Sequence, residues 1–190
     1  QRPSAKNTCK KVETFGKGNH WKVALLDLGA KQNIVRCLVD RDCEVTVYPA
    51  TTKAETILDT KPDGVMLSNG PGDPKDCGPI IDQVRILLDS DVPTFAICLG
   101  HQLTALAMGA DTCKLAYGHR GVNHPVRDTK SGRSYISSQN HGYCVMGETL
   151  PKGWRLRLKT STTARWRHAV PRPADLYGAV PSGGLARPEG

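Results

Sequence analysis

One of the seven cysteines stands where a strand is expected to give way to a helix. The run from Phe95 to Gln102 reads Phe-Ala-Ile-Cys-Leu-Gly-His-Gln, with Cys98 at the change from apolar to polar residues. A sharp turn of this kind lifts a side chain above the edge of a sheet, as in a nucleophile elbow. The helix N-terminus would favour the thiolate, the N–H of Leu99 could face an oxyanion, and Gly100 would allow close helix–strand contact. The pattern predicts a nucleophilic Cys98.

A second candidate for chemistry is the turn cluster at residues 68–74, Ser-Asn-Gly-Pro-Gly-Asp-Pro. Gly70 and Gly72 would let backbone N–H groups approach a ligand closely. The alternative interpretation of this segment by itself is an ordinary Gly-Pro turn.

The elements around these motifs alternate between strand and helix. Apolar and β-branched runs predict strands at 22–29, 44–48, 64–68 and 94–97, and helical spacing predicts helices at 32–41, 53–60, 80–88 and 102–108. This alternation predicts an α/β fold, a doubly wound and mostly parallel sheet with flanking helices. Both motifs would then lie at the carboxyl ends of strands, where such sheets bind ligands. Residues 113–145 are expected to form short, turn-broken β segments.

Composition excludes several classes of function. The net charge is +8, and it lies at the two ends: residues 1–20 carry +4, residues 155–190 carry +5 and residues 21–154 carry −1. No basic face is therefore expected on the folded part, which argues against nucleic-acid binding. No apolar run approaches the roughly 18 residues of a membrane span. The cysteines form no CxxC pair, zinc spacing or disulfide frame, which predicts reduced thiols and a cytoplasmic protein.

The motifs resemble those of a known family. The octapeptide around Cys98 resembles the nucleophile motif of the class I glutamine amidotransferases, and residues 68–74 resemble the oxyanion strand of that family, where Gly70 and Gly72 bind glutamine. Residues 118–126, Gly-His-Arg-Gly-Val-Asn-His-Pro-Val, and residues 138–143, Ser-Gln-Asn-His-Gly-Tyr, resemble one branch of it, the small subunits of carbamoyl-phosphate synthases. The resemblance covers about residues 20–158. It implies that the glutamine contacts include Leu99, Gln102, Asn140, Gly142 and Tyr143.

The resemblance also implies an activity. Glutamine would be hydrolysed through a Cys98 thioester, and the ammonia would pass to a large subunit that combines it with bicarbonate. ATP and Mg²⁺ would be used by that partner, and this domain would need no metal or organic cofactor. Two alternatives stay open: a catalytically dead glutamine-binding or regulatory module, and an amidotransferase component of guanine-nucleotide or anthranilate synthesis. The segment at 118–125 argues against the second.

The family pattern breaks near the C-terminus. The family places its base in a His-Pro-Glu stretch there, which this chain lacks; from about Thr160 it is rich in Arg, Pro, Gly and Ala. If the codons of residues 178–188 are read one nucleotide out of frame, they can encode Val-Gln-Phe-His-Pro-Glu-Ala-Ser-Pro-Gly-Pro. This leads to the hypothesis of two frame changes in the coding sequence, near residues 159 and 166. We therefore expect a linker from a missing N-terminal domain at 1–20, an incomplete amidotransferase domain at 21–158, and an aberrant, disordered tail at 159–190.

Overall fold

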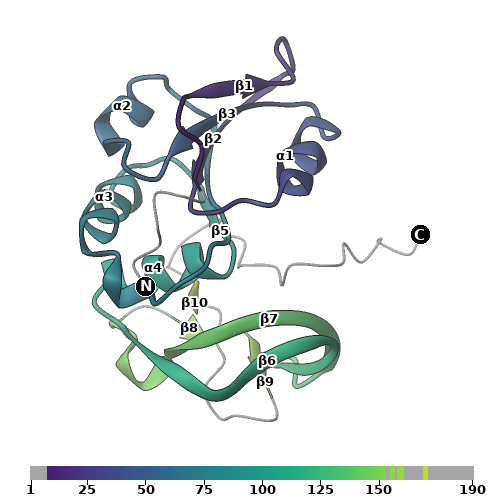
Figure 1. The fold of residues 1–190 in the computed structure, drawn as a ribbon. Coiled ribbons are helices and arrows are strands. Elements are labelled where there is room, and N and C mark those ends of the chain that lie inside the picture. The colour runs from purple at the N-terminus through teal and green to yellow at the C-terminus, as the bar shows by residue number, and fades with distance from the viewer. Residues whose placement is uncertain (1–7, 153–154, 157, 161–168, 171–190) are drawn as a thin grey trace.

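A five-stranded sheet forms the centre of the molecule (Figure 1). The computed structural model describes residues 8–152, 155–156, 158–160 and 169–170. The sheet has the order β1-β3-β2-β4-β5, with β1 antiparallel to β3 and the other neighbours parallel. Its strands are β1 (Glu13–Phe15), β2 (Trp21–Asp27), β3 (Cys43–Pro49), β4 (Gly64–Leu67) and β5 (Thr94–Ala96). The predicted doubly wound, mostly parallel sheet is confirmed.

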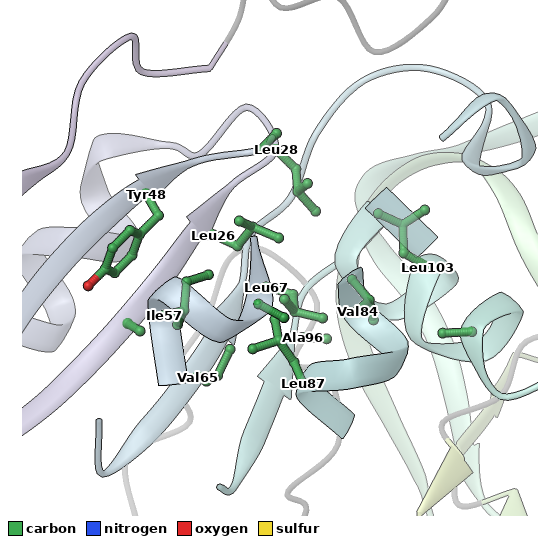
Figure 2. Packing of buried hydrophobic residues seen from close by; sticks show 14 of the residues in the cluster. Leu26, Leu28, Tyr48, Ile57, Val65, Leu67, Val84, Leu87, Ala96 and Leu103 are labelled. Carbon is green, nitrogen blue, oxygen red and sulfur yellow. The ribbon is translucent and has the colours of Figure 1, made fainter. Parts of the chain in front are cut away.

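Helices cover both faces of this sheet because its central strands are apolar on both sides. Along β2, Ala24 and Leu26 face one core and Leu25 faces the other. The first core lies under α2 (Ala54–Leu58), α3 (Gly78–Leu88) and α4 (Leu99–Ala107), as Figure 2 shows for its larger side chains. The second core lies under α1 (Gln32–Val39). The 3₁₀ turn η1 (Pro74–Asp76) leads from the turn after β4 into α3.

A long antiparallel ribbon follows α4 and lies beside the sheet (Figure 1). It consists of β6 (Asp111–Asp128) and β7 (Ser134–Met146), and it ends in the short 3₁₀ turn η2 (Gly147–Thr149). Register shifts interrupt the pairing between Lys114 and His119 and between Gly121 and His124. The sequence predicted several short β segments here, whereas irregular pairing keeps the two strands continuous through their turn-forming residues.

The two ends of the chain contribute short strands. Residues Glu13–Phe15 lie in the segment predicted to be a linker, yet they pair with β3 as β1, a strand that the sequence did not predict. At the other end, β9 (Leu158–Thr160) pairs with β6, and β8 (Arg155–Leu156) pairs with β10 (Ala169–Val170). Most of the predicted aberrant tail, 161–168 and 171–190, lies outside the described residues. No helix in the described ranges is both long and apolar enough to cross a membrane.

Candidate active site

Three loops meet at the carboxyl edge of the sheet, where the strand order reverses between β2 and β4. A doubly wound sheet opens a crevice at this switch point, and ligands bind there. Ser68, fully buried after β4, joins the three loops: its Oγ accepts from the N–H of Leu28 at 2.9 Å, and its carbonyl accepts from the N–H of Gly100 at 3.1 Å. The loops after β2, β4 and β5 are therefore fixed relative to one another.

Cys98 occupies a strained turn between β5 and α4. Its φ of 51° and ψ of −107° lie in a region that residues other than glycine rarely adopt. The helix begins directly after it, with Cys98 as the N-cap residue. A Cβ at Gly100 would lie 2.6 Å from the carbonyl oxygen of Leu67, so only glycine lets α4 approach β4 this closely. The structure thus forms the elbow that the sequence predicted.

Burial and nearby hydrogen-bonding and charged groups shift the pKa of the Cys98 thiol in opposite directions. Burial raises the pKa of Cys98 above its ordinary value, while the Leu99 N–H and the positive charge of Lys31 lower it by a smaller amount. The expected stabilisation of the thiolate by the helix N-terminus is therefore present but weaker than desolvation. The sulfur lies 3.9 Å from the carbonyl oxygen of Asn140 on β7, so the thiol faces the ribbon.

A cavity of about 740 Å³ opens in front of this thiol, between the sheet edge and the ribbon. Seven of the eight predicted site residues line it: Gly70, Gly72, Cys98, Gln102, Asn140, Gly142 and Tyr143. The eighth, Leu99, is buried in the core of the sheet domain, so only its backbone N–H can serve the site. Their individual roles stay predictions, but the structure places all eight around one thiol.

Further lining residues were not among the predicted site residues: Lys31, Asn69, Pro71, Asp73, Asp76, Arg120 and His141. Lys31 follows the β2 turn, and the side chain of Asn69 spans that turn, donating to the carbonyl of Gly29 at 3.1 Å and accepting from the N–H of Lys31 at 3.3 Å. Lys31 could have been predicted from the sequence, because every loop at the carboxyl edge of a parallel sheet is a candidate for the site.

Gly70 is required on steric grounds. A Cβ there would lie 2.1 Å from the carbonyl oxygen of Leu28, which no side chain could avoid without moving the backbone. Gly72 has a φ of 104°, a conformation that favours glycine. These glycines bring the backbone of the 68–74 turn against the cavity, as the oxyanion-strand prediction requires.

The ribbon is held against the sheet domain by polar contacts at the cavity wall. The buried amide of Gln102 on α4 donates from Nε2 to the carbonyl of Tyr143 at 2.8 Å. Desolvation raises the pKa of Tyr143, and the carboxylate of Asp73, which accepts from the Tyr143 hydroxyl, raises it further. Lys75 forms an ion pair with Asp111 at 2.6 Å. Gln102 therefore positions the ribbon in addition to lining the cavity.

Three histidines gather on the ribbon, and one of them, His141, also lines the cavity. The side-chain oxygen of Gln139 lies 2.8 Å from Nδ1 of His119 and 3.2 Å from Nε2 of His141, and the His119 ring stacks on that of His124 at 5.0 Å. Nδ1 of His141 lies 3.0 Å from the carbonyl oxygen of Tyr143. Burial lowers the pKa of His119, and burial with the neighbouring His119 lowers that of His141 to about 4. The rings of His119 and His141 are therefore neutral near pH 7.

Within the described part of the chain, no cluster of three or more His, Cys, Asp or Glu side chains could hold a metal ion. The groups available at the cavity are a strained cysteine, backbone N–H groups, side-chain amides, the cations of Lys31 and Arg120, the carboxylates of Asp73 and Asp76, the His141 imidazole and the Tyr143 hydroxyl.

Comparison with known proteins identifies the family to which this fold belongs. The family model of class I glutamine amidotransferases matches residues 24–178. The solved structure of a glutamine amidotransferase from Thermotoga maritima superposes with a TM-score of 0.64 at 15% identity, covering 80% of this chain and 72% of that one. That of a glutamine amidotransferase from Methylobacillus flagellatus gives 0.59 at 15% identity, covering 81% and 66%. The chain belongs to the class I glutamine amidotransferase family.

Its more similar relatives lie in one branch of that family. The carbamoyl phosphate synthase small chain of Vibrio cholerae is 51% identical over 163 residues, which are 85% of this chain and 43% of the relative. That of Escherichia coli K12 is 48% identical over 161 residues, 84% of this chain and 42% of the relative. The resemblance to this branch is confirmed at about half identity, and the chain spans less than half the length of these relatives.

Proposed function

We propose that this domain is the glutaminase of a carbamoyl-phosphate synthase small subunit, with Cys98 as its nucleophile. The observation that carries the proposal is the strained elbow at Cys98, whose thiol faces a cavity lined by the predicted glutamine contacts. Strain of this kind persists at functional sites because the surrounding structure enforces it. The similarity to carbamoyl phosphate synthase small chains supports the choice of branch.

The chemistry begins with attack of the Cys98 thiolate on the amide carbon of the glutamine side chain. The N–H of Leu99 faces the sulfur and is placed to donate to the oxyanion of the tetrahedral intermediate. The C–N bond then breaks, the nitrogen takes up a proton and leaves as ammonia, and the γ-glutamyl thioester remains on Cys98. Water attacks this thioester, which releases glutamate and returns the thiol.

The remaining lining residues recognise glutamine in this proposal. The backbone at Gly70 and Gly72 binds the substrate from the sheet side, and Gln102, Asn140, Gly142 and Tyr143 bind it from α4 and the ribbon. The ammonia passes to a large subunit, which uses ATP and Mg²⁺ to combine it with bicarbonate. Support for this partner comes from the names of the relatives.

A second candidate function is a glutamine-binding or regulatory module without turnover. Two observations favour it: burial raises the pKa of Cys98, and both ring nitrogens of His141 lie against the oxygens of Gln139 and Tyr143. A thiol in this state needs a base, and those contacts do not leave the His141 ring positioned as one. The family base would lie in the segment that the frame-change hypothesis concerns, outside the described residues.

Trapping and turnover separate the two candidates. The chain is incubated with a diazoketone analogue of glutamine and its peptides are analysed by mass spectrometry; we expect the adduct on Cys98, with none on that peptide in Cys98→Ser. An adduct mainly on Cys37, which lies on α1, would overturn the nucleophile assignment. Ammonia release from glutamine is then measured with the large subunit present. The comparison is between this chain and one whose C-terminal segment is rebuilt to carry His-Pro-Glu at positions 181–183.

General acid–base help contributes roughly 10²–10⁴-fold, so the rebuilt chain is expected to gain about that factor in turnover. A gain that Cys98→Ser removes supports the glutaminase. Labelling of Cys98 without turnover in either chain supports the binding module. Full turnover in the chain as written would refute the argument that its base is missing.

A further inference from the structure

Two cysteines outside the active site face each other across the ribbon. Cys113 on β6 and Cys144 on β7 are register partners in the antiparallel pairing. Their sulfur atoms lie 3.2 Å apart, and neither cysteine is in a disulfide. By contrast, the sulfurs of Cys43, Cys77 and Cys98 lie 3.6–3.9 Å from backbone carbonyl oxygens. The Cys113–Cys144 contact is a thiol–thiol contact that the proposed glutamine chemistry does not use.

The backbone around this pair has the geometry that a disulfide needs. Directly opposed residues of an antiparallel pair have Cα atoms about 4.5–5.5 Å apart, and a disulfide needs a Cα separation of about 4.4–6.8 Å. The Cys113–Cys144 pair lies in the regular stretch from Asp111 to Lys114, before the first register shift of the ribbon. The sulfurs therefore need to approach by only about 1 Å, to a bond of about 2.05 Å, which side-chain rotation supplies.

The two thiols differ in access. Cys144 is fully buried, whereas Cys113 is partly exposed on the side of the ribbon near η1. Lys75 of η1 lies close enough to Cys113 to interact with it electrostatically. Cys113 is thus the thiol that an oxidant from solvent reaches, and Cys144 is the thiol that resolves the product.

We propose that Cys113 and Cys144 form a redox modification site, a pair that hydroperoxides convert to a disulfide locking the base of the ribbon. Cys113 loses its thiol proton and its sulfur attacks the terminal oxygen of the hydroperoxide. The O–O bond breaks, the other oxygen takes up that proton and leaves as an alcohol or water, and Cys113 carries a sulfenic acid. The sulfur of Cys144 attacks the Cys113 sulfur, the S–S bond forms, and the S–O bond breaks. The leaving hydroxide takes the Cys144 proton and departs as water. Two electrons pass from the two sulfurs to the hydroperoxide.

The position of the pair gives the disulfide a structural consequence. Cys144 follows Tyr143, whose carbonyl accepts from Gln102, and Cys113 lies two residues after Asp111, which pairs with Lys75. The bond would close a loop of 31 residues and hold the ribbon where it joins the sheet domain. Closing a loop of this length is expected to raise the thermal midpoint by about 5–10 °C.

The bond is mapped by digestion that separates the relevant cysteines. The reduced full chain is treated with hydrogen peroxide, the remaining thiols are blocked, and the protein is cleaved before aspartates without reduction. Cleavage there places Cys98 in Asp91–Ala110, Cys113 in Asp111–Arg127 and Cys144 in Asp128–Ala174. We expect the second and third peptides to be joined, and dithiothreitol to release them and reverse the rise in thermal midpoint.

Three variants complete the test. Cys113→Ser and Cys144→Ala should lose both the joined peptides and the rise, and Cys37→Ser, a matched thiol on α1, should keep both. Cys113→Ser changes the partly exposed partner, so it tests the site even where Cys144→Ala fails to fold. Joining of Asp91–Ala110 to Asp128–Ala174 instead would overturn the assignment. So would oxidation of Cys113 to sulfinic acid without any joined peptide.

Discussion

The two walls of the cavity are held by different forces. On the sheet side, apolar packing and backbone geometry fix the site: Leu67, Leu99 and Leu103 are almost completely buried around the elbow. On the ribbon side, buried polar groups hold the wall together, chiefly Gln139 with its two histidines. The ribbon meanwhile exposes large apolar residues, with Tyr117 97% and Ile136 69% exposed.

This difference predicts which substitutions each wall tolerates. Apolar packing is non-directional but sensitive to lost volume, so the sheet side should respond to truncation. A buried hydrogen-bond network is directional and costly to leave incomplete, so the ribbon should respond to removal of one partner and to protonation. Each of the following measurements tests one side of that contrast.

The largest effect is expected at Leu67, the fully buried end of β4. Leu67→Ala removes apolar volume beneath both the Ser68 turn and α4, and it should lower the free energy of unfolding by about 3–4 kcal/mol. Urea unfolding followed by circular dichroism measures this. Ile86→Ala, at a 37% exposed position on α3, is the control and should cost less than about 1 kcal/mol. Equal losses in the two variants would mean that the sheet side is not held by close packing.

Acid should destabilise the ribbon through His141. Its pKa is lowered to about 4 in the folded state, whereas an unfolded histidine titrates near 6.5. Between these values the unfolded chain binds the proton more readily. The folded state is therefore fully favoured above pH 6.5 and loses stability as the pH falls towards 4, by at most about 3 kcal/mol.

The free energy of unfolding at pH 7.0 and 5.0 measures this loss. His141→Gln should show a shallower decrease over that interval than the unmodified chain, whereas His20→Gln, on an exposed loop near β2, should leave the decrease unchanged. A decrease that is the same with and without His141 would show that the ribbon carries no buried neutral imidazole at this position.

Removing the shared partner of the histidines tests the network itself. Gln139→Leu leaves ring nitrogens of His119 and His141 without that partner and should cost about 1–3 kcal/mol. Ser134→Ala, at an exposed position of the same strand, is the control and should be nearly neutral. If Gln139→Leu left the free energy of unfolding unchanged, the ribbon, like the sheet side, would be held by packing alone.

The smallest effect is expected at a solvent-exposed ion pair that joins the two walls. The ion pair between Lys75 and Asp111 joins η1 to β6, but both side chains are about half exposed. Exposed ion pairs contribute little because solvent screens them, so Lys75→Met should shift the urea midpoint only slightly, and high salt should remove the shift. A loss as large as that of Leu67→Ala would mean that this contact, rather than Gln102, holds the ribbon against the sheet domain.

The sequence by itself determined the sheet domain and the position of its elbow cysteine. Hydrophobic runs and turn residues within a few positions of each other specify β2 to β5 and their helices, and the Cys98 octapeptide is contiguous, so local patterns were sufficient. Tertiary structure alone decided what faces Cys98 across the cavity. Asn140 reaches it from 42 residues away, and Lys31 from the opposite direction along the chain. It also decided that the N-terminal residues Glu13–Phe15 add a strand to the sheet.

The pKa of Cys98 shows why some properties follow from the sequence and others only from the tertiary structure. A helix N-terminus can be read from the sequence, and it lowers the pKa, but desolvation depends on how completely other segments surround the sulfur. The same holds for the contact between Cys113 and Cys144, which no sequence pattern indicated. Their contact depends on strand register, and register in an irregular ribbon is set by long-range pairing rather than by neighbouring residues.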